Sequence, residues 1–134
     1  MPIFPDYDSF AAAYEKGEAQ IVSTRLVADL ETPVSAMLKL TRSAKYSFLL
    51  ESVEGGAVRG RYSIIGMNPD MIWKVAGSEA SINRKALHNP DGPFEPARLA
   101  PLESLRALLA ESRITLGSDA PPMAAGVFGY IGYD

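Results

Sequence analysis

Two apolar segments separated by a short glycine-containing loop constrain the fold of this chain more than any other feature. The first covers residues 47–52 and reads Ser-Phe-Leu-Leu-Glu-Ser, and the second covers residues 60–66 and reads Gly-Arg-Tyr-Ser-Ile-Ile-Gly. Both have the length of a β-strand, and the intervening Gly55 and Gly56 permit backbone angles that other residues avoid. The pattern predicts that the chain leaves a sheet, turns and re-enters it.

Charged and hydroxyl side chains lie where these two segments end. Glu51 and Ser52 close the first segment, and Arg59 and Arg61 lie at the start of the second. A carboxylate can hold an ammonium group, a guanidinium can hold a carboxylate, and apolar strand residues can form the surrounding walls. The strand ends therefore suit a small zwitterion. The alternative is a hairpin whose polar ends simply face water, as strand ends usually do.

Three helices are predicted beside the sheet. Asp6 is a suitable N-cap for a first helix that stops at Gly17. Pro33 suits the first position of a second helix, and Pro101 starts a third that Gly117 ends. Apolar side chains recur at helical spacing in all three segments, which favours one buried face on each helix.

Further strands complete the predicted architecture. The apolar residues of segments 19–28 and 123–131 predict a strand in each. The Gly77-Ser78 pair predicts a type II′ turn that joins two further strands, at 71–76 and 79–83. The strand at 46–52 is apolar on both faces, so we expect it to lie inside its sheet. The fold class is therefore α+β, a mostly antiparallel β-sheet with about three packed helices.

Composition excludes several classes of function. A net charge of −3 without a basic cluster argues against a nucleic-acid partner, and the absence of cysteine excludes disulfides and thiolate metal ligands. No apolar run reaches the ~20 residues that span a bilayer, and the N-terminus does not resemble a signal peptide. The single histidine, His88, is expected on the surface of a proline-rich loop. We therefore expect a soluble cytoplasmic protein with no metal site in this segment.

Several motifs resemble a known enzyme family. These motifs are Leu49-Leu50-Glu51-Ser52, the segment 60–66 with the following Asn68-Pro69, and the closing segment 126–134. Together they resemble the N-terminal region of anthranilate synthase component I, from about Phe10 to the last residue. The resemblance implies one N-terminal tryptophan-binding, regulatory domain over 1–134. Because the chain stops at Asp134 directly after a predicted strand, we expect a fragment that lacks the C-terminal chorismate-binding catalytic portion.

The resemblance also implies an effector site. In this family the Leu-Leu-Glu-Ser element lines the feedback site for tryptophan, together with a basic residue shortly downstream. Carried onto this sequence, the tryptophan-binding residues are Leu50, Glu51, Ser52 and Arg61. Tryptophan would then act as an allosteric feedback inhibitor.

The family's reaction is that of a lyase, which converts chorismate and ammonia into anthranilate and pyruvate with Mg²⁺. Its acidic metal ligands, histidine and arginine belong to the C-terminal portion. The resemblance therefore implies no catalytic residue and no cofactor in this segment, Mg²⁺ in the full-length parent, and no synthase activity from the segment alone. The implied partners are tryptophan, the C-terminal portion of the same chain and a glutamine amidotransferase subunit that supplies ammonia.

Three other interpretations remain open. Aminodeoxychorismate synthase component I of folate biosynthesis shares much of the pattern, and in that family tryptophan can be a structural ligand. The chain can instead be a non-catalytic module that docks the amidotransferase. A stand-alone amino-acid sensor is the third possibility.

Overall fold

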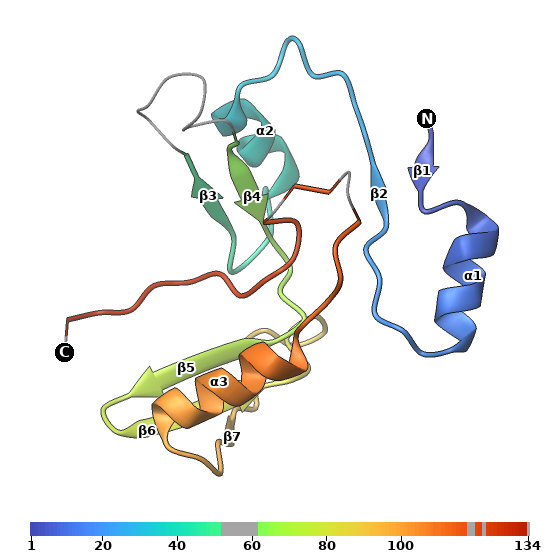
Figure 1. Ribbon diagram of the computed structural model, residues 1–134. Helices are drawn as coiled ribbons and strands as arrows, with labels where there is room; N and C mark the ends of the chain where they lie inside the picture. Colours follow the sequence, from blue (N-terminus) through green and yellow to red (C-terminus); the bar gives the residue numbers. More distant parts are fainter. Residues whose placement is uncertain (52–61, 118–119, 122, 134) are drawn as a thin grey trace. The chain divides into compact units, whose positions relative to one another are not determined.

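The computed structural model describes four stretches of the chain, namely residues 1–51, 62–117, 120–121 and 123–133. Figure 1 shows the helices and strands of the chain, which divides into two compact units. The first unit combines residues 1–27 with residues 102–134, and the second contains residues 28–101. Helices and small antiparallel sheets make up the described residues, which confirms the predicted α+β class. The prediction of a single regulatory domain stays a prediction.

The first unit contains a pair of very short strands. β1 (Ile3–Phe4) runs antiparallel to β2 (Ser23–Thr24), and the Thr24 hydroxyl donates a 2.8 Å hydrogen bond to the carbonyl of Pro2. The predicted strand over residues 19–28 is therefore much shorter in the structure. Among the described residues, β1 offers two residues for pairing, and the rest of this apolar stretch meets no further strand there.

Helix α1 (Tyr7–Glu15) begins at the predicted cap. The Asp6 carboxylate accepts hydrogen bonds from the backbone N–H and the hydroxyl of Ser9, at 3.0 and 2.9 Å. These donors, the backbone N–H first, lower the pKa of the Asp6 carboxyl because they favour its charged form. The rings of Phe10 and Tyr14 stack one turn apart, with centroids 5.8 Å from each other.

Acidification is expected to weaken this cap. The folded-state pKa of Asp6 is depressed, so its contribution to stability is present above the ordinary aspartate value of about 3.9 and is lost as the pH falls through the folded pKa. We expect hydrogen exchange at the Ser9 amide to accelerate in that range. The variant Asp6→Asn keeps an acceptor oxygen without the titration, so its Ser9 amide should show no such pH dependence. An identical acid response in both proteins would contradict the assignment.

In the second unit, α2 (Pro33–Leu40) also starts as predicted. Thr32 and Ser35 form a reciprocal capping box, in which each side-chain oxygen accepts the other residue's backbone N–H, at 3.1 and 2.9 Å. Glu31 accepts a hydrogen bond from the Ser35 hydroxyl and forms an ion pair with Lys39. The Lys39 ammonium, followed by that hydroxyl, lowers the pKa of Glu31.

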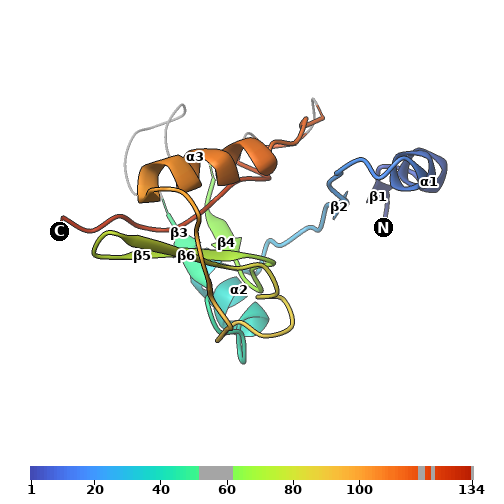
Figure 2. The same cartoon turned by 90° about the horizontal axis from the view of Figure 1, so that it is seen from below.

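The two apolar segments form the predicted hairpin. β3 (Phe48–Leu50) pairs antiparallel with β4 (Ile64–Gly66), with Phe48 opposite Gly66 and Leu50 opposite Ile64. α2 packs against both strands, as Figure 2 shows. Among the described residues this sheet has two strands, so the expectation that the first strand lies inside a larger sheet is wrong for this part of the chain.

A three-stranded antiparallel sheet follows, made of β5 (Ile72–Ala76), β6 (Glu79–Asn83) and β7 (Glu95–Pro96). Gly77 has a φ of +59°, and Ser78 is not among the residues with positive φ. This combination confirms the predicted type II′ turn. β7 was not predicted, because its proline-rich sequence is atypical of a strand.

The last part of the chain differs most from prediction. α3 (Pro101–Glu111) ends six residues before Gly117, at a stretch that includes Ile114 and Thr115, whose branched side chains disfavour helix. Ser104 and Leu108 are its buried residues, whereas Leu102 of the predicted apolar face is 66% exposed. The described residues of segment 123–131 form no strand, which corrects that prediction. Within the described residues these backbone groups meet no partner strand.

The apolar core of the described chain is small. Its buried apolar side chains are Ala80, Ala86 and Leu108, while much larger ones such as Leu30, at 97% exposure, face outwards. No helix in the described stretches is long and apolar enough to cross a membrane.

Candidate functional site

The predicted effector residues lie where β3 ends. Leu50 is the last residue of the strand and is 48% exposed, and Glu51 follows it with an exposed side chain. Ser52 and Arg61 lie outside the described residues. The structure therefore places an apolar side chain and a carboxylate in succession at one end of the hairpin. The four-residue tryptophan site as a whole stays a prediction.

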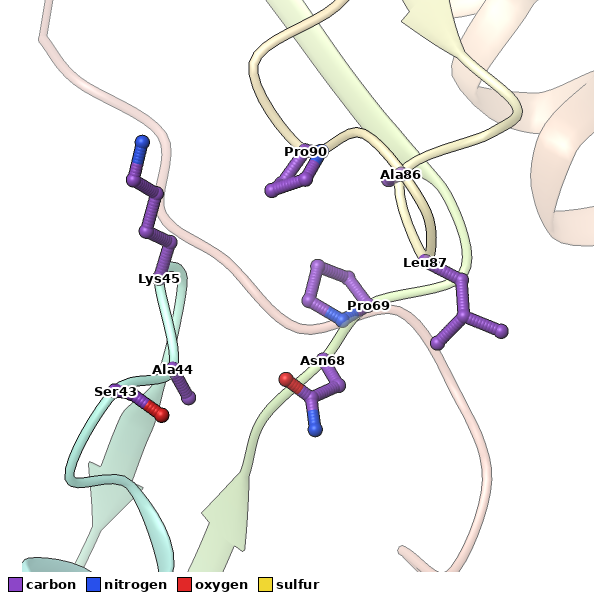
Figure 3. A pocket seen from close by; sticks show the side chains of 8 residues that line it. All are labelled: Ser43, Ala44, Lys45, Asn68, Pro69, Ala86, Leu87 and Pro90. Atoms are coloured by element: carbon purple, nitrogen blue, oxygen red, sulfur yellow. The ribbon is translucent and has the colours of Figure 1, made fainter.

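A second feature, which sequence reasoning missed, is a hollow of about 230 Å³ within the second unit (Figure 3). Three segments line it: the turn before β3, the link between β4 and β5, and the loop after β6. We call it the loop pocket, and its lining residues are Ser43, Ala44, Lys45, Asn68, Pro69, Ala86, Leu87 and Pro90. No local sequence pattern marks these residues, because they converge only when the strands between them pair.

An ion pair joins two of the segments that line the loop pocket. The Lys45 ammonium donates a hydrogen bond to the Asp91 carboxylate, 46 positions further along the chain. Asp91 raises the pKa of Lys45, first through this hydrogen bond and then through its charge. The stabilisation is therefore present below the ordinary lysine pKa and is lost as the pH rises through the higher folded value.

Asn83 holds one wall of the loop pocket in place. Asn83 is 1% exposed. Its amide nitrogen donates a 2.7 Å hydrogen bond to the carbonyl of Asn89. Its amide oxygen accepts a 2.9 Å hydrogen bond from the N–H of Lys85. Both bonds bend the chain after β6 back on itself. They fix the backbone of the loop that carries Ala86 and Pro90.

The backbone beside the loop pocket adopts two unusual conformations. Tyr46 and Asn68 have φ values of +56° and +51°, in the left-handed region. Asparagine tolerates this region, but an aromatic residue there is strained. Tyr46 directly follows Lys45, so the strained residue lies at the edge of the loop pocket.

A further hollow of about 290 Å³ lies in the first unit, between α1 and the short strands. Its lining is apolar and consists of Ile3, Pro5, Tyr7, Phe10 and Val22. It offers no charged group that could orient a ligand.

The described stretches contain no cluster of side chains suited to binding a metal ion. No three side chains of histidine, cysteine, aspartate or glutamate gather there in a way that could hold a metal ion. His88 is exposed on its loop, as predicted. For the part of the chain that the structure describes, no residue can therefore be named as a ligand of Mg²⁺.

In the comparison with known proteins, three relatives from different bacteria carry the same name. The chain is 53% identical over 128 residues to anthranilate synthase component 1 of Cereibacter sphaeroides, a match that covers 96% of this chain and 25% of the relative. The protein of that name from Synechocystis sp. is 39% identical over 132 residues, with 98% and 25% covered. The one from Thermus thermophilus is 37% identical over 110 residues, with 81% and 21% covered.

The chain thus spans about a quarter of the length of the curated relatives it matches, in their N-terminal part. No family model matches the chain. No solved structure matches it either.

Proposed function

Because this chain belongs to the anthranilate synthase component 1 family, we propose that it is the regulatory segment of an anthranilate synthase and contributes to a feedback site for tryptophan. The complete protein would convert chorismate, with ammonia from a glutamine amidotransferase subunit, into anthranilate and pyruvate in the cytoplasm. Mg²⁺ would bind in the remainder of the polypeptide. This segment would then act on the reaction only through regulation.

The observation that carries this proposal is the exposed position of Leu50 and Glu51 at the end of β3. A leucine that is 48% exposed has apolar surface still to bury, which favours contact with an indole ring. The neighbouring carboxylate is exposed, and the part of the chain described here shows no hydrogen bond to it. It is therefore available to the ammonium group of an amino acid.

Coupling to the reaction would follow from differential affinity. Tryptophan would favour the state of the enzyme that is poorer at chemistry, and by linkage the bound substrate would weaken tryptophan binding by the same factor. The hairpin register supports a well-defined site, since β4 and α2 hold β3, which Glu51 directly follows.

Glu51→Gln in the full-length protein tests the proposal. Losing a charge-assisted hydrogen bond costs about 1.5–3 kcal/mol, so the tryptophan concentration for half inhibition is expected to rise roughly 10- to 100-fold. The turnover number should not change, because Glu51 is not proposed to touch chorismate. Inhibition is measured in steady-state assays of anthranilate formation.

The matched control is Glu79→Gln, which removes an exposed carboxylate from β6 of the same unit. Glu79→Gln should leave the inhibition by tryptophan unchanged.

Ser52→Phe is expected to fill the effector site and relieve inhibition while catalysis continues. Unchanged inhibition in both Glu51→Gln and Ser52→Phe would refute the assignment.

The product identifies the branch of the family. Anthranilate is expected, as the names of the relatives suggest. Formation of aminodeoxychorismate, without inhibition by tryptophan, would instead assign the protein to folate biosynthesis. Capture of the amidotransferase by this segment alone would favour a docking role.

A further inference from the structure

We propose that the loop pocket is a second small-molecule site, separate from the tryptophan site proposed above, and that it takes a free α-amino acid with an apolar side chain. The inference rests on four features of the second unit: the walls of the pocket, the charges at its rim, the anchored loop and the strained backbone. None of them involves Glu51 or the end of β3 at which it lies.

The walls suit a small apolar group. Figure 3 shows the rings of Pro69 and Pro90 on one side of the hollow and the side chains of Ala44 and Lys45 on the other. A volume of about 230 Å³ lies below the ~300–1,000 Å³ of sites for drug-sized ligands. An amino-acid side chain fits this size, and its burial between proline rings and aliphatic atoms is favourable.

The rim suits a zwitterion. Lys45, a lining residue, carries an ammonium, and Asp91, which directly follows the lining residue Pro90, carries the carboxylate that pairs with it. A ligand carboxylate can bind Lys45 while a ligand ammonium binds Asp91, and the Ser43 hydroxyl and Asn68 amide line the same hollow. The existing pair has side chains 65% and 59% exposed, so screening makes it weak and its exchange for ligand contacts costs little.

The charges also exclude other ligand classes. A phosphate or a simple dianion would be attracted by Lys45 but repelled by the carboxylate of Asp91 beside it. A purely cationic ligand would be attracted by Asp91 but repelled by the ammonium of Lys45. A molecule that carries one charge of each sign, about as far apart as those of an α-amino acid, avoids both conflicts.

The site is held ready before any ligand arrives. Asn83 ties down the loop that carries Pro90 by two hydrogen bonds. Tyr46, beside Lys45, keeps a left-handed backbone that an aromatic residue rarely adopts. Backbone strain of this kind recurs at ligand clamps, where the surrounding structure maintains it.

Calorimetric titration of the full-length protein with L-phenylalanine and with L-leucine tests the proposal. Saturable binding is expected for both. N-acetyl-L-phenylalanine lacks the ammonium and L-phenylalanine methyl ester lacks the carboxylate, so each should bind roughly tenfold more weakly or worse. Equal binding of all three phenylalanine compounds would contradict recognition of a zwitterion.

Three variants connect the binding to the rim. Lys45→Gln and Asp91→Asn are each expected to weaken binding roughly tenfold. The double exchange of Lys45→Asp with Asp91→Lys restores an ion pair but reverses its direction, so it should recover stability without recovering binding. Lys39→Gln is the matched control, because it breaks an exposed ion pair elsewhere in the same unit.

Two results would overturn the proposal. One is the absence of saturable binding up to about 10 mM amino acid, a range in which even weak affinities are measurable. The other is binding that survives Lys45→Gln and Asp91→Asn but disappears in Glu51→Gln, which would place the ligand in the tryptophan site. Failure of the tryptophan proposal, by contrast, appears as unchanged feedback inhibition in Glu51→Gln and leaves binding at the loop pocket unaffected.

Discussion

Asn83→Ala is expected to lower the free energy of unfolding by about 1–3 kcal/mol. The substitution removes both hydrogen bonds of a buried amide and leaves the Asn89 carbonyl and the Lys85 N–H without the partners they have here. Each of the two hydrogen bonds is worth ~0.5–1.5 kcal/mol, and the Asn89 carbonyl keeps a second hydrogen bond, of 3.3 Å, from the N–H of Gly92. Because a typical domain has only ~5–15 kcal/mol of stability, this loss is large.

The measurement is equilibrium urea unfolding, followed through the fluorescence of Trp73, the single tryptophan in the sequence. The unfolding midpoint should fall while the denaturant slope stays the same. Asn89→Ala is the matched control, since Asn89 accepts the hydrogen bond through its backbone carbonyl and has an exposed side chain. If both variants lost the same small amount of stability, Asn83 would not be the anchor of this loop.

Gly66→Ala should destabilise the β3–β4 hairpin by about 1–3 kcal/mol, the usual cost of forcing extra volume into a packed site. A Cβ at Gly66 would overlap ring atoms of Phe48, which lies directly opposite on β3. Either the ring must leave its position or the two strands must separate. Both changes disturb the strand that ends at Leu50 and Glu51, so feedback inhibition should weaken as well.

A double-mutant cycle isolates this clash. Phe48→Leu removes the ring atoms that a Cβ at Gly66 would meet, so adding Gly66→Ala to it should cost much less than adding Gly66→Ala to the natural protein. Gly117→Ala is the control, because a Cβ there would meet no atom within 4 Å. Strict additivity in the cycle would show that the cost of Gly66→Ala arises from something other than Phe48.

Local sequence signals predicted the elements whose determinants lie close together in the chain. Asp6 caps α1 through a residue three positions away, and Gly77 supplies the positive φ of a two-residue turn. The hairpin of β3 and β4 was also predictable, because two apolar runs of strand length flank a glycine pair. For the candidate effector site, the sequence placed Leu50 and Glu51 at a strand end, where the structure has them. Its other two members lie outside the described residues.

Longer-range features could not be predicted in this way. Segments 19–28 and 123–131 are apolar enough for strands, yet a strand also needs a partner for its backbone, and the described residues offer little or none. β7 forms in spite of its proline because β6 lies beside it. Strand propensity therefore indicated where a strand was possible, while pairing determined where one formed.

The sequence by itself determined the resemblance of this chain to its relatives, its helix caps and the hairpin that Glu51 follows, since each depends on residue types at short, fixed spacings. Only the tertiary structure decided that Lys45 meets Asp91 and that the prolines at 69 and 90 line one hollow. Those residues are far apart in the chain, and strand pairing and the buried Asn83 bring them together. Contacts between distant residues depend on the free energy of the whole packed unit, which no local pattern contains.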